Sequence, residues 1–142
     1  ADMDGRLLFD LIERFVSRSA NSITFTSLGQ LRYLSCIKHV DAVVGNSSSG
    51  LTEVPSFKKP TINIGDRQRG RLKAVSVIDC SPEKVAISNA IRTGLAPSFQ
   101  EKLKTVKNPY GSGGASERIV QKLEAEDFSG ILKKEFHDLS LG

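Results

Sequence analysis

The chain has 142 residues, of which 39% are hydrophobic and 25% charged, and its net charge is +4. This length suits one domain with its own core, and the composition argues against wholesale disorder. The small positive charge is compatible with a phosphate-bearing ligand but does not require nucleic acid. No apolar run reaches the roughly 18 residues of a membrane helix, so we expect no membrane partner.

The cysteines and the N-terminus suggest the compartment and the extent of the protein. Cys36 and Cys80 lack metal-ligand spacing and indicate core residues of a reduced, cytoplasmic protein. The opening residues, "ADMDGRLLF", have no basic region before the apolar ones, so no signal peptide is expected. They also lack an initiator Met, and we expect the chain to be a piece of a longer protein.

Helix and strand patterns alternate in the first third of the chain. Apolar residues at helical spacing predict an amphipathic helix over 5–17. The β-rich alternation of "SITFTSL" predicts a strand over 22–28, and a short helix is expected over 29–39. The continuous apolar run "DAVVG", 41–45, is typical of a strand covered on both faces.

The alternation continues through the middle of the chain. A short helix is expected over 49–57, and Pro55 predicts a kink or an early end because it cannot donate a helix hydrogen bond. The runs "PTINIG", 60–65, and "VSVID", 75–79, predict two further strands. Alternating strands and helices indicate βαβ units, and therefore an α/β fold with a parallel sheet and flanking helices.

Helix signals dominate the last part of the chain. Ser81 is placed to cap a helix, with Pro82 as its first residue and Gly94 just past its end. A turn-rich loop over 108–116 leads into another amphipathic helix, and the tail over 128–136 has the pattern of one more.

Two loops follow predicted strands, where ligands of parallel sheets bind. The first, "GNSSSG", holds Ser47, Ser48 and Ser49 with Gly50 behind them. Small residues between a strand and a helix point backbone N–H groups at an anion, so phosphate binding is one interpretation. An ordinary helix-capping turn and a flexible linker are the alternatives, because serine and glycine favour both.

The second loop, "IGDRQRGRLK", carries a cluster of basic residues that is typical of phosphate contacts: Arg67, Arg69, Arg71 and Lys73. A solvated surface loop is the alternative. Glu53, on the helix that follows the serines, is either a solvated carboxylate or an acceptor for the hydroxyls of a ribose. His39 and His137 show no convincing partners, and no catalytic triad or metal site can be assembled from the sequence.

The segment "GNSSSGLTEVPSFKKPTINIGDRQRGRLKAVSVIDC", 45–80, closely resembles the UDP-N-acetylglucosamine 2-epimerase family. The likeness is strongest to the hydrolysing branch, which makes N-acetylmannosamine-type sugars for sialic-acid-like compounds. "FTSLGQLRYLS" and "NPYGSGGASERI" are also similar to family segments. The resemblance implies two Rossmann-like domains facing a cleft, as in GT-B glycosyltransferases. Residues 1–142 would be the carboxyl-terminal UDP-binding domain, without the first domain.

The resemblance also implies roles for individual residues. Ser47 and Ser48 match serines that contact the diphosphate, and Gly50 opens the helix behind them. Glu53 matches the acid that holds the ribose hydroxyls, and Arg67 matches an arginine implicated in UDP binding. These matches favour the anion-loop interpretation of the serines.

Further implications concern the base and the reaction. Tyr33 falls where the family places an aromatic ring against uracil. The family chemistry begins with proton abstraction at C2 and elimination of UDP, and water then adds to the glucal intermediate. The family's acid/base residues lie outside this segment, so we expect the chain alone to turn over no substrate. Ser112 and Gly114 depart from the family pattern.

Several alternatives stay open on the sequence alone. The parent could be a non-hydrolysing 2-epimerase or a GT-B glycosyltransferase, or the chain could be a non-catalytic nucleotide-binding domain. The partner expected is a UDP-sugar, with no nucleic acid, cofactor or metal. We expect the full-length parent to form a homo-oligomer. The sugar itself is not specified.

Overall fold

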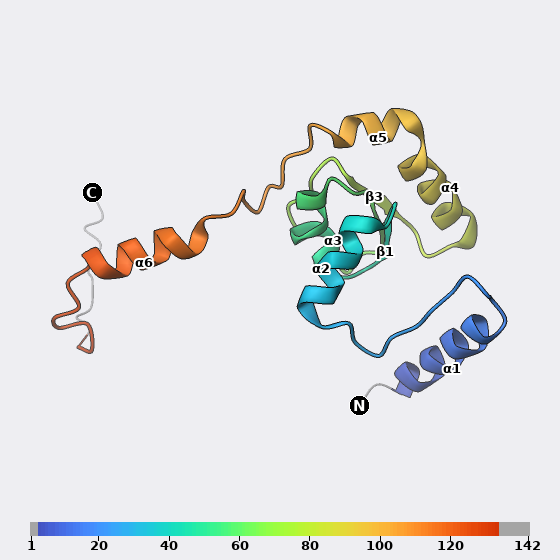
Figure 1. Cartoon of the computed structure of the whole chain (residues 1–142), viewed down its shortest axis with the longest axis horizontal. Helices are drawn as coiled ribbons and strands as arrows, with labels where there is room; N and C mark the ends of the chain where they lie inside the picture. Colours follow the sequence, from blue (N-terminus) through green and yellow to red (C-terminus); the bar gives the residue numbers. More distant parts are fainter. Residues whose placement is uncertain (1–2, 134–142) are drawn as a thin grey trace, which may run out of the picture. The chain divides into compact units, whose positions relative to one another are not determined.

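The computed structural model describes residues 3–133 of the chain. The chain divides into two compact units, 1–110 and 111–142, and the first holds the sheet and most of the helices. Figure 1 shows the elements in chain order. Strands and helices alternate through the middle of the first unit, so the predicted Rossmann-like α/β class, with a parallel sheet and flanking helices, is confirmed.

The first helix leaves its apolar face uncovered. α1, Met3–Ser17, confirms the helix predicted over 5–17. Leu7 and Phe15 are 61% and 66% exposed, and the other large apolar side chains of α1 between them are exposed as well. A contiguous apolar face of this kind is unusual on a free surface and is typical of one that packs against another part of a protein.

The prediction of a strand over 22–28 is wrong. This segment is irregular, and Ile23 and Phe25 are 76% and 55% exposed. A strand is stable only when its backbone groups pair with a neighbouring strand. In the described part of the chain no strand pairs with this segment, so the alternating pattern has no ladder to join.

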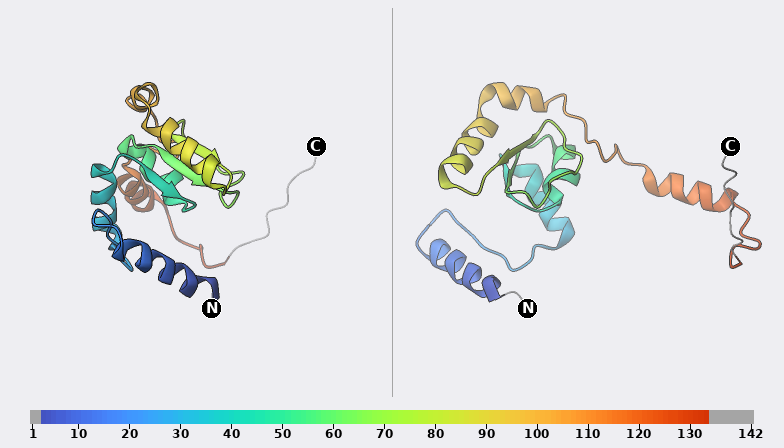
Figure 2. Two further views of the ribbon diagram at one scale, coloured as in Figure 1. Left: turned by 90° about the vertical axis from the view of Figure 1, so that its right-hand side faces the viewer. Right: turned by 180° about the vertical axis from the view of Figure 1, so that it is seen from behind.

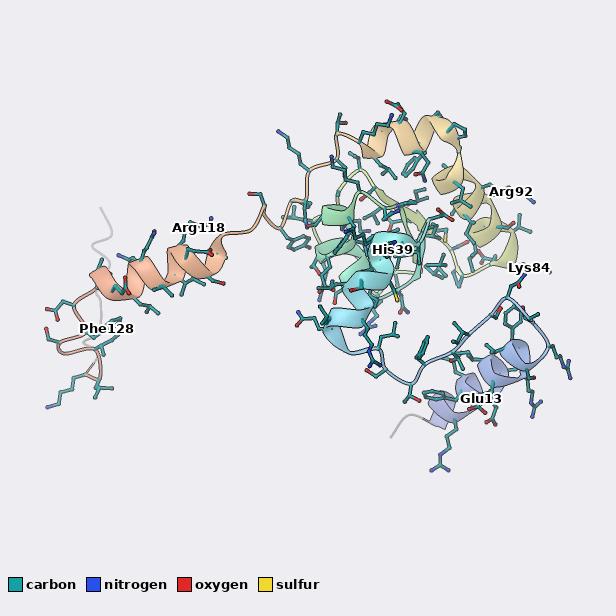
Figure 3. The ribbon with its side chains drawn as sticks, in the orientation of Figure 1. Glu13, His39, Lys84, Arg92, Arg118 and Phe128 are labelled. Carbon is teal, nitrogen blue, oxygen red and sulfur yellow. The ribbon has the colours of Figure 1, made fainter. Side chains whose placement is uncertain are left out.

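α2, Gly29–His39, confirms the helix predicted for these residues. The Ser27 hydroxyl accepts a hydrogen bond from the Gly29 amide at 3.2 Å, which supports the turn into the helix. Ile37 is 2% exposed and belongs to the core. His39 is exposed at the last residue of α2 (Figure 3).

The sheet consists of β1, Val43–Gly45, β2, Thr61–Ile64, and β3, Val77–Cys80, in the order β1-β2-β3. Both strand pairs are parallel, and Ile62 of the central strand faces partners on both sides in the register. All three strands overlap the apolar runs that predicted them. The expectation that β1 is covered on both faces is wrong, because β1 lies at the edge of the sheet and Val44 is 47% exposed. Because the strands are parallel, the loops that follow β1 and β2 lie at one edge of the sheet.

The helix expected over 49–57 is interrupted, as the proline predicted. α3, Ser49–Thr52, ends at Glu53, and a separate 3-10 turn, η1, covers Val54–Phe57. Pro55 lies in the first positions of η1, where its missing N–H costs no hydrogen bond.

α4, Lys84–Leu95, corrects the predicted helix boundaries. The N-cap is Glu83 rather than Ser81, whose hydroxyl donates a hydrogen bond to the Glu83 carboxylate and caps no backbone amide. Pro82 therefore precedes the helix instead of opening it. Gly94 lies inside the helix, where it is buried.

α5, Pro97–Leu103, follows α4 directly and was not predicted. Proline at the first helical position is a helix-start signal that the sequence does contain. Leu103 is 2% exposed, so this short helix is held by packing on the core more than by its length.

Helices cover both faces of β2. A Cβ added to Gly50 of α3 would lie 2.6 Å from Cγ2 of Thr61, and one added to Gly94 of α4 would lie 3.5 Å from Cδ1 of Ile62. Neighbouring side chains of a strand point to opposite faces, so α3 and α4 pack on opposite sides of the sheet. Figure 2 shows α4 alongside the strands.

The core of the first unit lies between these layers. Its buried hydrophobic side chains come from most of the helices, from β2 and from the segments before β3 and after α5: Ile37, Leu51, Val54, Ile62, Ala74, Ala90, Leu103 and Val106. The expectation that the cysteines are core residues is wrong. Cys36 is exposed on the outer side of α2, and Cys80 is half-buried at the end of β3.

The second unit contains α6, Ala115–Ala125, which confirms the helix expected after the turn-rich loop. Its apolar residues Ile119 and Leu123 are 58% and 52% exposed. The helix expected over 128–136 is not present in 128–133, which forms turns, and the rest of that range lies outside the described residues. His137 also lies outside them.

Candidate functional site

The serine loop connects β1 to α3 and is shaped by its own hydrogen bonds. The Ser47 hydroxyl accepts from the Ser49 amide at 3.3 Å, and the Ser47 carbonyl accepts from the Gly50 amide at 3.2 Å. Within residues 3–133, the amides of Ser47 and Ser48 donate to no protein acceptor. Two neighbouring amides just after β1 are therefore available to an anion.

The helix behind the loop is shorter than predicted, and this changes the electrostatic argument. α3 has four residues, and Ser48 at its N-cap makes no side-chain capping bond. A helix dipole needs several aligned peptides, so α3 contributes little of the effect of a full-length helix. Any attraction for an anion must come mainly from the free amides and the hydroxyls.

Tyr33 joins α2 to the serine loop. Its phenol oxygen lies 2.7 Å from the Ser49 hydroxyl, and both side chains are half-buried. They line a cavity of about 420 Å³ together with the end of β1, Asn46, Ser47, Gly50 and Thr61. Ser48 is exposed and is not among the residues that line it.

A second cavity, of about 700 Å³, is also lined by Tyr33. Glu53 lines it at the point where α3 ends, and the irregular segment 23–28 and the first residues of α2 form the remaining wall. Because Tyr33 lines both cavities, they share a wall at this side chain. The structure thus brings Tyr33, Ser47, Gly50 and Glu53 into one region.

The basic loop after β2 is linked to the serine loop by a neutral side chain. Gln68 is 2% exposed, and its Nε2 donates to the Asn46 carbonyl at 2.7 Å. Arg67, Arg69 and Arg71 are exposed. Arg67 lines neither cavity, so the structure places its loop beside the serines without directing its side chain into the site.

Lys73 closes the basic loop through an ionic contact. Its ammonium lies 2.8 Å from an Asp79 carboxylate oxygen, and Asn63 donates to the other oxygen at 2.7 Å. Partial burial opposes ionisation of Asp79, but the hydrogen bonds from Lys73 and Asn63 outweigh it and lower the pKa of the carboxyl. Lys73 is thereby engaged, which leaves the arginines as the candidate anion ligands of this loop.

Several residues of this region were missed in the sequence. Ser49 was noticed as a loop serine but not as the partner of Tyr33, and Asn46 and Gln68 were not singled out. A usable signal for Gln68 exists: it is the one uncharged polar residue between Arg67 and Arg69. A neutral side chain flanked by exposed charges is the natural candidate to turn inward.

Among the helices of residues 3–133, none is long and apolar enough to cross a membrane. The same residues contain no group of three or more histidine, cysteine or acidic side chains placed to hold a metal ion.

Comparison with known proteins identifies one family and several relatives of this chain. The family model described as UDP-N-acetylglucosamine 2-epimerase matches residues 1–124. Polysialic acid biosynthesis protein P7 of Escherichia coli is 39% identical over 132 residues, which cover 91% of this chain and 33% of that protein. The GDP/UDP-N,N'-diacetylbacillosamine 2-epimerase (hydrolyzing) of Campylobacter jejuni is 44% identical over 80 residues, or 56% of this chain and 21% of that protein.

A third relative is the UDP-N,N'-diacetylbacillosamine 2-epimerase (hydrolyzing) of Legionella pneumophila, 32% identical over 87% of this chain and 32% of that protein. The chain spans about a third, or less, of the length of these curated relatives. The family match nevertheless covers the sheet, the serine loop, the basic loop and α6 up to residue 124. The chain belongs to the UDP-N-acetylglucosamine 2-epimerase family.

Proposed function

We propose that the chain is the UDP-binding part of a hydrolysing UDP-sugar 2-epimerase. The observation that carries the proposal is the junction of the two cavities at Tyr33. One cavity is lined by Ser47, which has a free amide, and by the hydroxyls of Ser47 and Ser49, and the other is lined by Glu53. A nucleoside diphosphate has groups that match these features: phosphates for the serine loop, a ribose for the carboxylate and a base for the Tyr33 ring.

In this proposal the serine loop holds the diphosphate. The free amides of Ser47 and Ser48 donate to phosphate oxygens, and the hydroxyls of the loop add donors of their own. Gly50 is buried against Thr61, so the α3 backbone runs close beneath the loop. Arg67 supplies a charge-assisted hydrogen bond from the neighbouring loop once a ligand is bound.

The nucleoside lies in the larger cavity, which Tyr33 and Glu53 line. The Glu53 carboxylate accepts hydrogen bonds from the ribose hydroxyls, and the Tyr33 ring packs against uracil. The hydrogen bond between Tyr33 and Ser49 fixes the ring relative to the serine loop. The position of the base is thus set by the same contact that orders the phosphate site.

The reaction that this site serves is an elimination followed by a hydration. The C2–H and C1–O bonds of the sugar break, and UDP leaves with the negative charge of the broken bond. Water then adds its hydroxyl to C1, and C2 receives a proton on the face opposite the one that lost its proton. The free amides, the loop hydroxyls and Arg67 stabilise the charge that develops on UDP, an electrostatic contribution that reaches about 3–4 kcal/mol per donor in well-studied enzymes.

The rest of the enzyme lies in the longer parent protein. The relatives are about three times the length of this chain, and α1 presents an exposed apolar face. We infer that residues 1–142 belong to the second domain of a two-domain, GT-B-like protein, whose first domain supplies the acid/base residues. The chain alone then turns over no substrate. We further propose that the parent is a cytoplasmic homo-oligomer.

A labelled-solvent assay of the parent protein tests this function. Incubated in D₂O with UDP-N-acetylglucosamine or its diacetamido analogue, it is expected to release UDP and a free 2-epimeric sugar carrying deuterium at C2. Mass spectrometry and NMR of the products give the measurement. A UDP-linked epimer would instead assign the non-hydrolysing reaction, and transfer of unlabelled sugar to an acceptor would assign a glycosyltransferase.

A further inference from the structure

Gln68 is an unusual residue for its position. It lies in a surface loop between two exposed arginines, yet only 2% of it is accessible to solvent. Buried glutamine is uncommon and normally has all its polar atoms paired. Here the Nε2 group is paired with the Asn46 carbonyl at 2.7 Å, whereas Oε1 has no partner within the described residues.

The hydrogen bond from Gln68 acts on one particular peptide group. The Asn46 carbonyl belongs to the same planar peptide as the Ser47 amide, and the structure contains no cis peptide bond in its described part. In a trans peptide, C=O and N–H point in opposite directions. Fixing the Asn46 carbonyl toward Gln68 therefore fixes the Ser47 N–H on the far side of that peptide.

The unpaired Oε1 and the paired Nε2 of Gln68 have different consequences, the first for stability and the second for binding. A buried Oε1 without a partner disfavours the folded state, so Gln68 is not an optimal choice for packing. Its Nε2 contact, by contrast, polarises the Asn46–Ser47 peptide and makes the Ser47 N–H a stronger donor. The same contact ties the loop of Arg67 to the serine loop.

We propose that Gln68 is a positioning residue for diphosphate binding, which it promotes by orienting the Ser47 amide and by docking the Arg67 loop. This inference rests on the proposed UDP site. Gln68 itself need not touch the ligand. Its effect on binding passes through the Asn46–Ser47 peptide and through the position of Arg67.

The test is UDP binding by Gln68→Met, which keeps the length of the side chain but removes both polar atoms. UDP affinity is expected to fall about tenfold, because a donor to a charged group loses its orientation. The midpoint of thermal unfolding is expected to change little, because removal of the unpaired buried oxygen offsets the lost hydrogen bond to the Asn46 carbonyl. Loss of affinity without loss of stability is a combination that a purely structural role would not produce.

Gln100→Met is the matched control. Gln100 also donates through Nε2 to a backbone carbonyl, that of Gly94 at 2.6 Å, but at the end of α4. Its substitution should leave UDP affinity unchanged. Independently of any variant, the Ser47 amide proton of the wild-type chain should move downfield on UDP addition in a ¹⁵N-edited NMR titration.

The possible results of these experiments distinguish failure of the Gln68 role from failure of the proposed UDP site. If Arg67→Ala weakens UDP binding but Gln68→Met does not, the positioning role is overturned and the UDP site stands. An unmoved Ser47 amide in a chain that binds UDP would likewise overturn it. If the folded wild-type chain binds no UDP, the proposed site itself fails.

Discussion

Glu53→Ala is expected to lower the affinity for UDP by about 10- to 100-fold, because a hydrogen bond to a charged group is worth about 1.5–3 kcal/mol. Glu53 lines the larger cavity, and among residues 3–133 no other acidic side chain does. The ribose hydroxyls would lose their acceptor, while the diphosphate contacts of the serine loop remain. Calorimetric or NMR titration of UDP into the variant and the wild-type chain gives the measurement.

A modified ligand makes this prediction specific to the ribose. 2′,3′-Dideoxy-UDP lacks the hydroxyls that Glu53 is proposed to hold, so wild type and Glu53→Ala should bind it equally. Glu101→Ala removes a carboxylate of α5 that is 70% exposed and pairs with Lys104 just after this helix, so it should leave UDP affinity unchanged. A loss in Glu53→Ala that is the same for both ligands would contradict the assignment to the ribose.

Gly50→Ala is expected to destabilise the first unit by about 1–3 kcal/mol, the usual cost of overpacking a closed site. The added methyl would lie 2.6 Å from Cγ2 of Thr61, and both residues are buried. The Thr61 hydroxyl also donates to the Gly50 carbonyl at 2.8 Å, so α3 cannot move away without straining this bond. Chemical denaturation followed by circular dichroism measures the loss of unfolding free energy.

A second substitution that removes Cγ2 of Thr61 should relieve the clash. Thr61→Ser removes Cγ2 and keeps the hydroxyl, so the double variant Gly50→Ala/Thr61→Ser should regain most of the lost stability. Gly94→Ala is the matched control, because its added methyl lies 3.2 Å from the Cβ of Pro60 and alanine is the better helix former by about 1 kcal/mol. Its net effect should therefore be small. Failure of Thr61→Ser to restore Gly50→Ala would show that the close approach is not the cause.

The sheet and the place of the candidate site could be predicted from the sequence because their signals are local. The run "DAVVG" is a short apolar segment that contains β1, and the serines follow it directly, although its predicted cover on both faces is wrong. Pro55 likewise marked the break between α3 and η1, since a missing N–H acts at its own position. Where the chemistry of one residue decides the local structure, the sequence pattern was sufficient to predict that structure.

Other features depend on partners that a local pattern does not contain. The segment 22–28 alternates like a strand but has no neighbouring strand in the described residues. Ser81 has the chemistry of an N-cap, yet the Glu83 carboxylate takes its hydroxyl. Gly94 reads as a helix end, whereas its lack of a side chain serves the close contact of α4 with Pro60. The buried position of Gln68 is explained only by its hydrogen bond to Asn46, which is distant in sequence.

The central claim, that this chain holds a UDP site at the serine loop, is tested most directly by one calorimetric titration. UDP, UMP and ADP are added in turn to the folded wild-type chain. UDP is expected to bind more tightly than UMP, which lacks one phosphate, and more tightly than ADP, which has the wrong base. No binding of UDP, or equal affinity for all three nucleotides, would contradict the claim.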